Sequence, residues 1–137
     1  MIRDIDISLM IPCGAASATT VSDALGVQPS RVQELPMQVL REDGGWHEKM
    51  LYVWVLDSPK KTDAGGDPIA RLNALADLIE AFGSRLPSIR SPLKPLIMIL
   101  YHITPGDKFG QLRVPAELMR RYSSWNLDVV VRLAAVA

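Results

Sequence analysis

The segment LIMILYHI, Leu96–Ile103, decides the fold class, because it is a nearly continuous apolar run between a proline-rich segment and a Thr-Pro-Gly turn. A short apolar run with such boundaries is typical of a strand in the centre of a sheet, buried on both faces. A transmembrane helix needs about 20 apolar residues, so this run is far too short to cross a bilayer.

Three further segments predict strands. Apolar and polar residues alternate over Ile5–Ile11 and again over Leu127–Leu133, which is the period of a strand with one face on a core. Met50–Leu56 is rich in aromatic and β-branched residues, and these favour strands.

The segment Val32–Leu40 has two interpretations. Pro36 lacks an amide donor, so this stretch is either an edge strand or an extended loop, but not a central strand. The sequence Glu42-Asp43-Gly44-Gly45 that follows is typical of a hairpin turn.

The first predicted helix is short. Thr20 and Asp23 approximate a capping box at its start, and Gly26 stands where a left-handed residue closes a helix. Pro29 then turns the chain. Each of these residues is explained by ending a helix, so we rank the stretch low as a functional site.

Two longer helices follow. The second begins at Asp67-Pro68, where an N-cap residue precedes a proline in the first turn, and Gly83 is placed to end it. The third opens at Val114-Pro115 and is broken by Asn126.

The resulting element order is β-α-(β)-β-α-β-α-β. It predicts an α+β fold with a mainly antiparallel sheet of four to five strands, helices packed on one face, and a ferredoxin-like arrangement with an added αβ unit. The chain has 137 residues, which fit a single domain spanning 1–137.

Composition excludes two classes of partner. Lys and Arg number 15 and Asp and Glu number 15, so the formal net charge is zero. The chain therefore lacks the basic surface of a nucleic-acid binder and the polybasic segment that binds anionic membranes. A neutral chain repels its own copies weakly, and we expect a homodimer or another homo-oligomer, or a complex with another protein.

The single cysteine, Cys13, excludes an intrachain disulfide and suits a reducing compartment. The N-terminal segment carries Asp4 and Asp6 and alternates in polarity, unlike a secretory signal with its basic start and apolar centre. We therefore expect a cytoplasmic protein.

Strand periodicity singles out one sheet face as the candidate interface or ligand face. If the β-branched sets of the two most apolar strands face the helices, the opposite face carries Tyr52, Trp54, Met98, Leu100 and His102. Large exposed apolar surfaces mark interaction sites, and Tyr, Trp and Met are enriched there. Three alternatives could cover this face. They are the chain's own segment Val32–Asp43 or its proline-rich loop, a second copy of the protein, and a small-molecule ligand whose identity is unknown.

We find no motif for catalysis, and expect no metal and no cofactor. His47, His102 and Cys13 lack the spacing of a metal site. Cys13 stands outside any nucleophile motif and is interpreted as a small structural residue.

Two weaker anion-binding patterns are present. The segment GAASATT, residues 14–20, lies between a predicted strand and a helix but lacks both the P-loop and the dinucleotide pattern. Arg85, Arg90 and Lys94 gather around prolines and form a candidate rim that attracts anions.

Two short motifs carry a family resemblance. LGVQP, Leu25–Pro29, and WVLDS, Trp54–Ser58, are similar to an L-G-x-x-P turn and a W-x-L-x-S strand end in a bacterial family known as domain of unknown function 4279. The matching residues are Leu25, Gly26, Pro29, Trp54, Leu56 and Ser58. The resemblance implies a small α/β domain of the kind that serves in interaction or immunity, and it carries no established activity.

The sequence thus favours a non-enzymatic binding domain that acts through a protein partner or through self-association. The alternative is a small-molecule-binding or catalytic domain that uses the open sheet face near Trp54 and His102.

Overall fold

The computed structural model describes residues 2–13, 18–59, 67–89, 94–103, 106 and 111–135. Over these residues, five strands form one sheet in the order β2-β3-β1-β4-β5. The strands are β1 (Ile2–Cys13), β2 (Arg31–Leu40), β3 (Trp46–Asp57), β4 (Leu96–Ile103) and β5 (Asp128–Ala135). The helices are α1 (Ala18–Leu25), α2 (Pro68–Glu80), the 3-10 helix η2 (Gly83–Ser88) and α3 (Ala116–Ser124). None of the helices in this part of the chain is long and apolar enough to span a membrane.

The α+β class is confirmed, but the prediction of a mainly antiparallel sheet is wrong, because the sheet is mixed. β1 pairs antiparallel with β3 and β4, and β2 pairs antiparallel with β3. β5 instead runs parallel to β4, its neighbour at the sheet edge. Helix α3 connects these two strands, and a crossover through a helix brings the chain back in the same direction. The connection through α3 therefore makes β4 and β5 a parallel pair.

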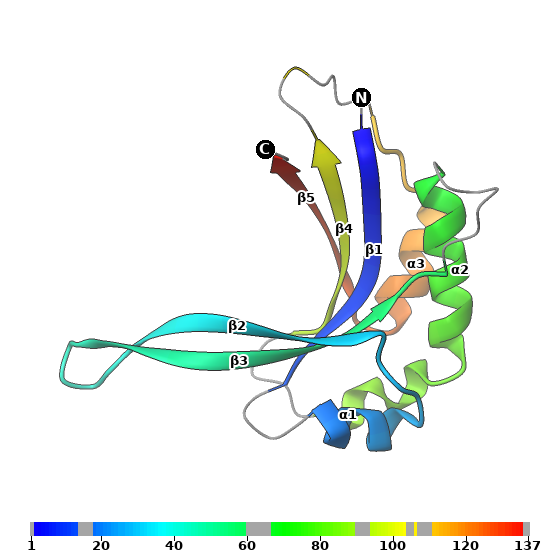
Figure 1. Ribbon diagram of the computed structural model, residues 1–137. Coiled ribbons are helices and arrows are strands. Elements are labelled where there is room, and N and C mark those ends of the chain that lie inside the picture. The colour runs from blue at the N-terminus through cyan, green and yellow to red at the C-terminus, as the bar shows by residue number, and fades with distance from the viewer. Residues whose placement is uncertain are drawn as a thin grey trace.

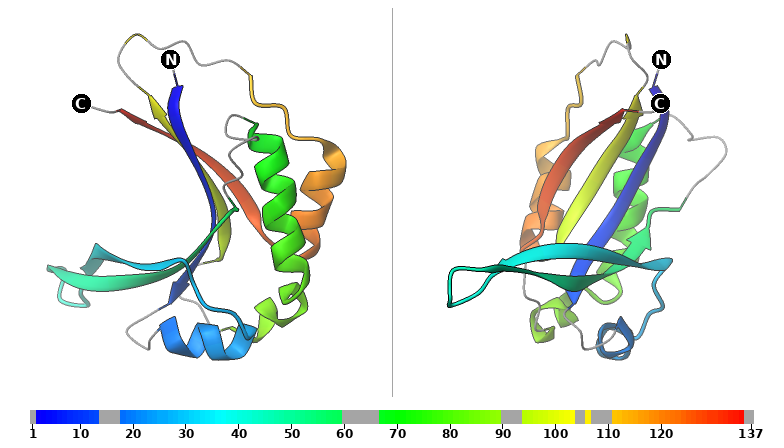
Figure 2. Two further views of the ribbon diagram at one scale, coloured as in Figure 1. Left: turned by 45° about the vertical axis from the view of Figure 1, so that its right-hand side comes forward. Right: turned by 60° about the vertical axis from the view of Figure 1, so that its left-hand side comes forward.

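The helices and the sheet enclose one core. Figure 2 shows α2 and α3 standing against one face of the sheet, while α1 lies at the end where β1 finishes. Alternate residues of β1 point to the helices, as the sequence predicted, and meet apolar residues of all three helices. The core includes Ile5, Ile7, Leu9, Ile11, Val21, Leu25, Leu72, Leu75, Ile79, Leu118 and Tyr122.

Several helix ends follow the sequence prediction. The carboxylate of Asp67 accepts a hydrogen bond from the backbone N–H of Ile69 at 3.0 Å, so Asp67 is the N-cap of α2. Gly26 closes α1 with a φ of 72°, in the left-handed region where glycine is favoured. Asn126, after α3, has a φ of 57°, and asparagine tolerates this region better than most residues.

Gly83 has a role that differs from the predicted one. Helix α2 ends three residues earlier, at Glu80, and Gly83 instead begins η2. A Cβ at this position would stand 2.3 Å from Nε1 of Trp125. Glycine is therefore required here because η2 packs closely against the Trp125 indole.

The segment Val32–Leu40, for which the sequence allows an edge strand or an extended loop, is a strand. β2 pairs with β3 along its whole length, and Pro36 lies on the outer edge strand of the sheet, where a missing amide donor is tolerated. The predicted hairpin turn joins the two strands, with Gly44 at a φ of 86°.

The β2–β3 hairpin extends beyond the sheet. β1 pairs only with Tyr52–Asp57 of β3, so Trp46–Leu51 pair with β2 alone. Figure 1 shows this part of the hairpin projecting to one side of the molecule, across the direction of β4 and β5. We call residues 35–51 the arm. Its six paired residues on each strand give it a length of about 20 Å.

Candidate functional site

The five residues of the predicted face lie on two faces of the sheet, so the prediction of a single face is wrong. In the register, Trp54 of β3 lies opposite Ile11 and Tyr52 lies opposite Cys13, and both β1 residues belong to the helix-covered core. Met98, Leu100 and His102 point the other way, because Met98 lies opposite Ser8 rather than opposite a core residue.

Trp54 is a structural residue of the core. Its side chain is fully buried, and its Nε1–H donates a hydrogen bond to Oγ of Ser22 in α1 at 3.0 Å. At the other end of the WVLDS motif, the buried Ser58 accepts a hydrogen bond from Nε of Arg71 in α2 at 3.2 Å. The motif therefore ties β3 to two helices, which explains its residue types without a ligand.

The pair of His102 and Asp6 lies on the open face of the sheet, which also carries the ion pair of Arg31 and Asp57. Nε2 of His102 lies 2.7 Å from Oδ2 of Asp6, and each side chain is about one-third exposed, at 30% and 33%. A carboxylate in this position fixes the orientation of an imidazole that can then exchange protons. Catalysis by a nucleophile would need an accessible hydroxyl or thiol beside the pair, and Ser8, the next residue on this face, is only 1% exposed.

The candidate residues for metal binding or catalysis lie on different elements of the fold. His47 lies on the arm, His102 on β4, and Cys13 at the end of β1. Cys13 is buried, and burial raises the pKa of its thiol, so little thiolate forms near neutral pH. Across the described ranges, His, Cys, Asp and Glu do not form groups of three or more that could hold a metal ion.

The arm exposes large apolar side chains. Leu40 and Trp46 are directly opposite each other next to the turn, and they are 59% and 67% exposed. Pro36 is exposed opposite Met50, which is 40% exposed. Alternate residues share a face, so both pairs lie on the same side of the hairpin as Trp54, at positions that the helices do not cover. We call Pro36, Leu40, Trp46 and Met50 the arm stripe.

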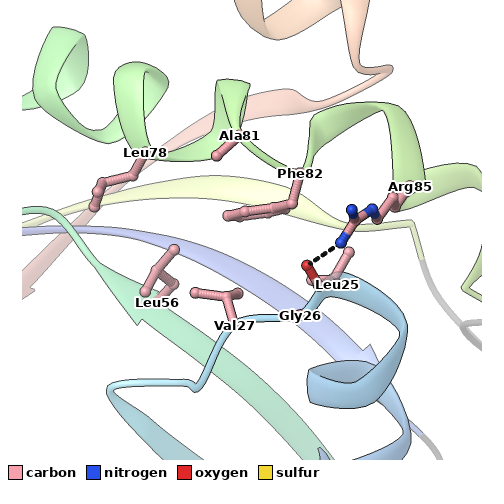
Figure 3. Close-up of a pocket in the computed structure, with 8 residues that line it drawn as sticks. All are labelled: Leu25, Gly26, Val27, Leu56, Leu78, Ala81, Phe82 and Arg85. Atoms are coloured by element: carbon pink, nitrogen blue, oxygen red, sulfur yellow. Dashed lines mark hydrogen bonds between the residues drawn. The ribbon is translucent and has the colours of Figure 1, made fainter.

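A cavity of about 250 Å³ lies beside the LGVQP turn (Figure 3). It is lined by Leu25, Gly26, Val27, Leu56, Leu78, Ala81, Phe82 and Arg85. Gly26 and Val27 belong to the turn whose residue types the sequence explains by the end of a helix, without a functional site. No sequence pattern predicts this cavity, because its walls come from three distant segments.

The predicted basic rim is only partly described. Arg85 donates a hydrogen bond from Nη1 to the carbonyl oxygen of Leu25 at 3.1 Å. Lys94 pairs with Asp128 of β5 at 3.0 Å, and Arg90 lies outside the described residues. The segment GAASATT falls mostly outside them as well, since 14–17 are not described.

Sequence patterns alone missed the arm stripe, the cavity and the partner of His102. Asp6 and His102 are 96 positions apart, and only the β1–β4 register brings them together. The sequence contains the Asp-Gly turn and the aromatic Trp46 of the arm, but it does not show how much of the hairpin pairs with β1.

Comparison of this sequence with protein-family models, with curated proteins and with solved structures finds no match. The resemblance carried by Leu25–Pro29 and Trp54–Ser58 stays a prediction. The function is therefore inferred from the geometry of the chain itself.

Proposed function

We propose that the protein is a binding module that engages another protein through the arm, without catalysis of its own. The observation that carries this proposal is the cross-strand pair of Leu40 and Trp46, which is 59% and 67% exposed at the end of a projecting hairpin. Tryptophan is the residue type most enriched among the side chains that dominate binding energy at protein interfaces.

Within the described residues, the arm lacks the third strand that usually stabilises a hairpin. A two-stranded hairpin is marginally stable in water, and a third strand or a helix normally covers one of its faces. β1 stops pairing at Tyr52, so the arm lies beyond this third strand. A partner that covers the arm stripe would remove its apolar surface from water and order the hairpin at the same time.

Charges around the arm stripe favour a different protein over a second copy. Glu48 lies opposite Gln38, between the two apolar pairs, and Glu34 lies nearer to the base of the arm on the same face. Two copies placed stripe to stripe would bring these carboxylates together, which is unfavourable. The proposed partner therefore offers an apolar groove with basic side chains at its edge.

The test compares purified wild-type protein with a double variant, Leu40→Ser and Trp46→Ser, as bait in a lysate of the source cells. Glu117→Ala, an exposed residue of α3 outside the arm, is the control. We expect one protein to be retained by the wild type and by the control and to be lost with the double variant. That protein, once purified, must bind the wild type directly. Equal retention by all three baits contradicts the proposal, provided that circular dichroism shows the variants to be folded.

Self-association is a second candidate function, and the outer edge of β5 favours it. β5 is an edge strand with Val131 and Leu133 47% and 50% exposed. Two copies of β5 that pair antiparallel about a two-fold axis at Val130 would place Asp128 opposite Arg132 of the second copy. Opposite charges directly across such a pair are stabilising, and a two-fold interface contains the contact twice. The other edge, β2, is blunted by Pro36.

Charge reversal tests this second candidate by light scattering. We expect the wild type to have the molar mass of two chains, and Asp128→Arg or Arg132→Asp alone to lower it towards one chain. The combined variant restores the opposite-charge pairs and should recover the dimer. A wild type that stays monomeric up to millimolar concentration, or a combined variant that stays monomeric, contradicts β5 pairing.

We also infer that the first four strands are related to the ferredoxin-like arrangement. The strand order β4-β1-β3-β2, with antiparallel neighbours and β-α-β-β-α-β connectivity, supports this relation. The α3–β5 unit is then an addition beside β4, and the long β2–β3 hairpin is a second departure that provides the arm.

A further inference from the structure

The cavity beside the LGVQP turn is built by three segments of the chain. Figure 3 shows Leu25, Gly26 and Val27 on one side, Leu56 of β3 beside them, and side chains from the end of α2 and from η2 on the other. Leu25 and Phe82 are buried, at 1% and 3% exposure, whereas Leu78 is 41% exposed. The cavity is therefore an opening in the surface with an apolar floor.

The size and lining of the cavity suit a small apolar group. Its volume is about 250 Å³, and six of the eight lining residues are Leu, Val, Ala or Phe. An apolar protein cavity of roughly 150 Å³ is enough to hold a benzene molecule. This space therefore has room for an aliphatic or aromatic group of roughly six to eight carbon atoms.

One end of the cavity is cationic. The guanidinium of Arg85 lies beside Leu25 and Phe82 in Figure 3, and it uses Nη1 to donate to the Leu25 carbonyl oxygen at 3.1 Å. A guanidinium has five N–H donors, so this bond positions the group and leaves others for a ligand. In the part of the chain that the structure describes, no carboxylate forms an ion pair with Arg85.

Gly26 makes room for this guanidinium. Its φ of 72° is in the left-handed region, and a Cβ built there would stand 3.0 Å from Nη1 of Arg85. Any other residue at this position would push against the guanidinium that contacts the turn. The turn that ends α1 therefore also shapes the cationic end of the cavity.

We propose that this cavity binds a small monocarboxylate with a compact apolar body, with the carboxylate on Arg85 and the apolar group over Phe82. A guanidinium fork and a carboxylate match in charge and in planar geometry, and such charge-assisted hydrogen bonds are about twice as strong as neutral ones. Apolar lining with one polar anchor is the usual composition of a ligand site. This site is separate from the arm and does not depend on its function.

The test titrates the full chain with hexanoate and follows the backbone amides by ¹H–¹⁵N NMR. We expect saturable shifts at Gly26, Val27 and Phe82. The uncharged analogue hexanamide and the cation hexylammonium, which offers no acceptor to a guanidinium, are the ligand controls. Hexanoate should bind more tightly than either.

Two variants separate the contribution of charge from that of volume. Arg85→Gln should weaken hexanoate binding by about tenfold and leave hexanamide binding unchanged. Ala81→Phe should fill the cavity and abolish binding of both ligands. Ser84→Phe, an exposed neighbour outside the lining, should bind as the wild type does.

Three results would each overturn the proposal. The first is the absence of saturable shifts up to the solubility limit of hexanoate. The second is equal binding of hexanoate and hexylammonium, or an equal effect of Arg85→Gln on acid and amide. The third is a set of shifts that maps away from the eight lining residues, or that persists in Ala81→Phe.

Discussion

The hydrogen bond between Trp54 and Ser22 gives a direct test of the position of Trp54 in the core. Ser22→Ala removes the acceptor for the indole N–H, which is fully buried and would then have no partner. An unsatisfied buried donor costs about 1–3 kcal/mol, and alanine returns at most about 0.5 kcal/mol through its higher helix propensity in α1. We therefore expect Ser22→Ala to lower the free energy of unfolding by about 0.5–2.5 kcal/mol.

A double-mutant cycle isolates this contribution. Trp54→Phe removes the donor, so Ser22→Ala should cost about 0.5 kcal/mol or less in that background, with a coupling energy of about 1–2 kcal/mol. Urea denaturation followed by circular dichroism gives each free energy from the midpoint and the slope. Additive effects of the two substitutions would refute the hydrogen bond between Trp54 and Ser22.

Three other substitutions or conditions test the packing. Gly83→Ala should lower the free energy of unfolding by about 1–3 kcal/mol, because the new methyl group overlaps the Trp125 indole; a thermal midpoint equal to that of the wild type would exclude the close approach. Burial raises the pKa of Tyr122, so above about pH 10 the unfolded chain loses a proton that the folded chain retains. The free energy of unfolding, measured by urea titration at each pH, should therefore fall as the pH rises from 10 to 12. Tyr122→Phe should make this fall with pH less steep, and an unchanged pH dependence contradicts the buried phenol. Burial also raises the pKa of the Cys13 thiol, so iodoacetamide at pH 7.5 should label the folded protein at least about tenfold more slowly than the urea-unfolded chain, and equal rates would show an accessible thiolate.

Some helix ends and the strand centres were predictable because they depend on local chemistry, whereas α1 begins at Ala18, before the predicted capping box of Thr20 and Asp23. Asp67 caps α2 through its own carboxylate, and Gly26 closes α1 in a left-handed conformation that glycine adopts without a steric penalty. Leu96–Ile103 is strand β4 with the predicted boundaries, because a short apolar run between breakers has few alternatives.

The faces of β3 were not predictable from residue types. We expected the β-branched residues to face the helices, yet Val53 and Val55 lie on the open face and are buried, at 4% and 0% exposure. Figure 1 shows that the sheet bends where the arm leaves it, and the side chains of Val53–Leu56 are buried on both faces of β3. Both faces of β3 are therefore apolar, and only the pairing of Trp54 with Ile11 decides which one meets the core.

The candidate sites depend on contacts between distant segments. The cavity needs α1, β3 and η2 to meet, and the arm is exposed because β1 ends its pairing at Tyr52. Neither property leaves a periodic pattern in one stretch of sequence. The basic residue Arg85 was visible as part of an anion-attracting rim, but its contact with the Leu25–Gly26 turn was not.

The arm's role in binding is tested most directly by photo-crosslinking in living cells. Trp46 is replaced by the photoreactive residue benzoylphenylalanine, and Glu117, exposed on α3 and outside the arm, is replaced in the same way as the control. We predict one discrete crosslinked protein from position 46 that is absent from position 117 and is lost when Leu40→Ser is added. No crosslink from position 46, or the same products from both positions, would contradict a binding role for the arm.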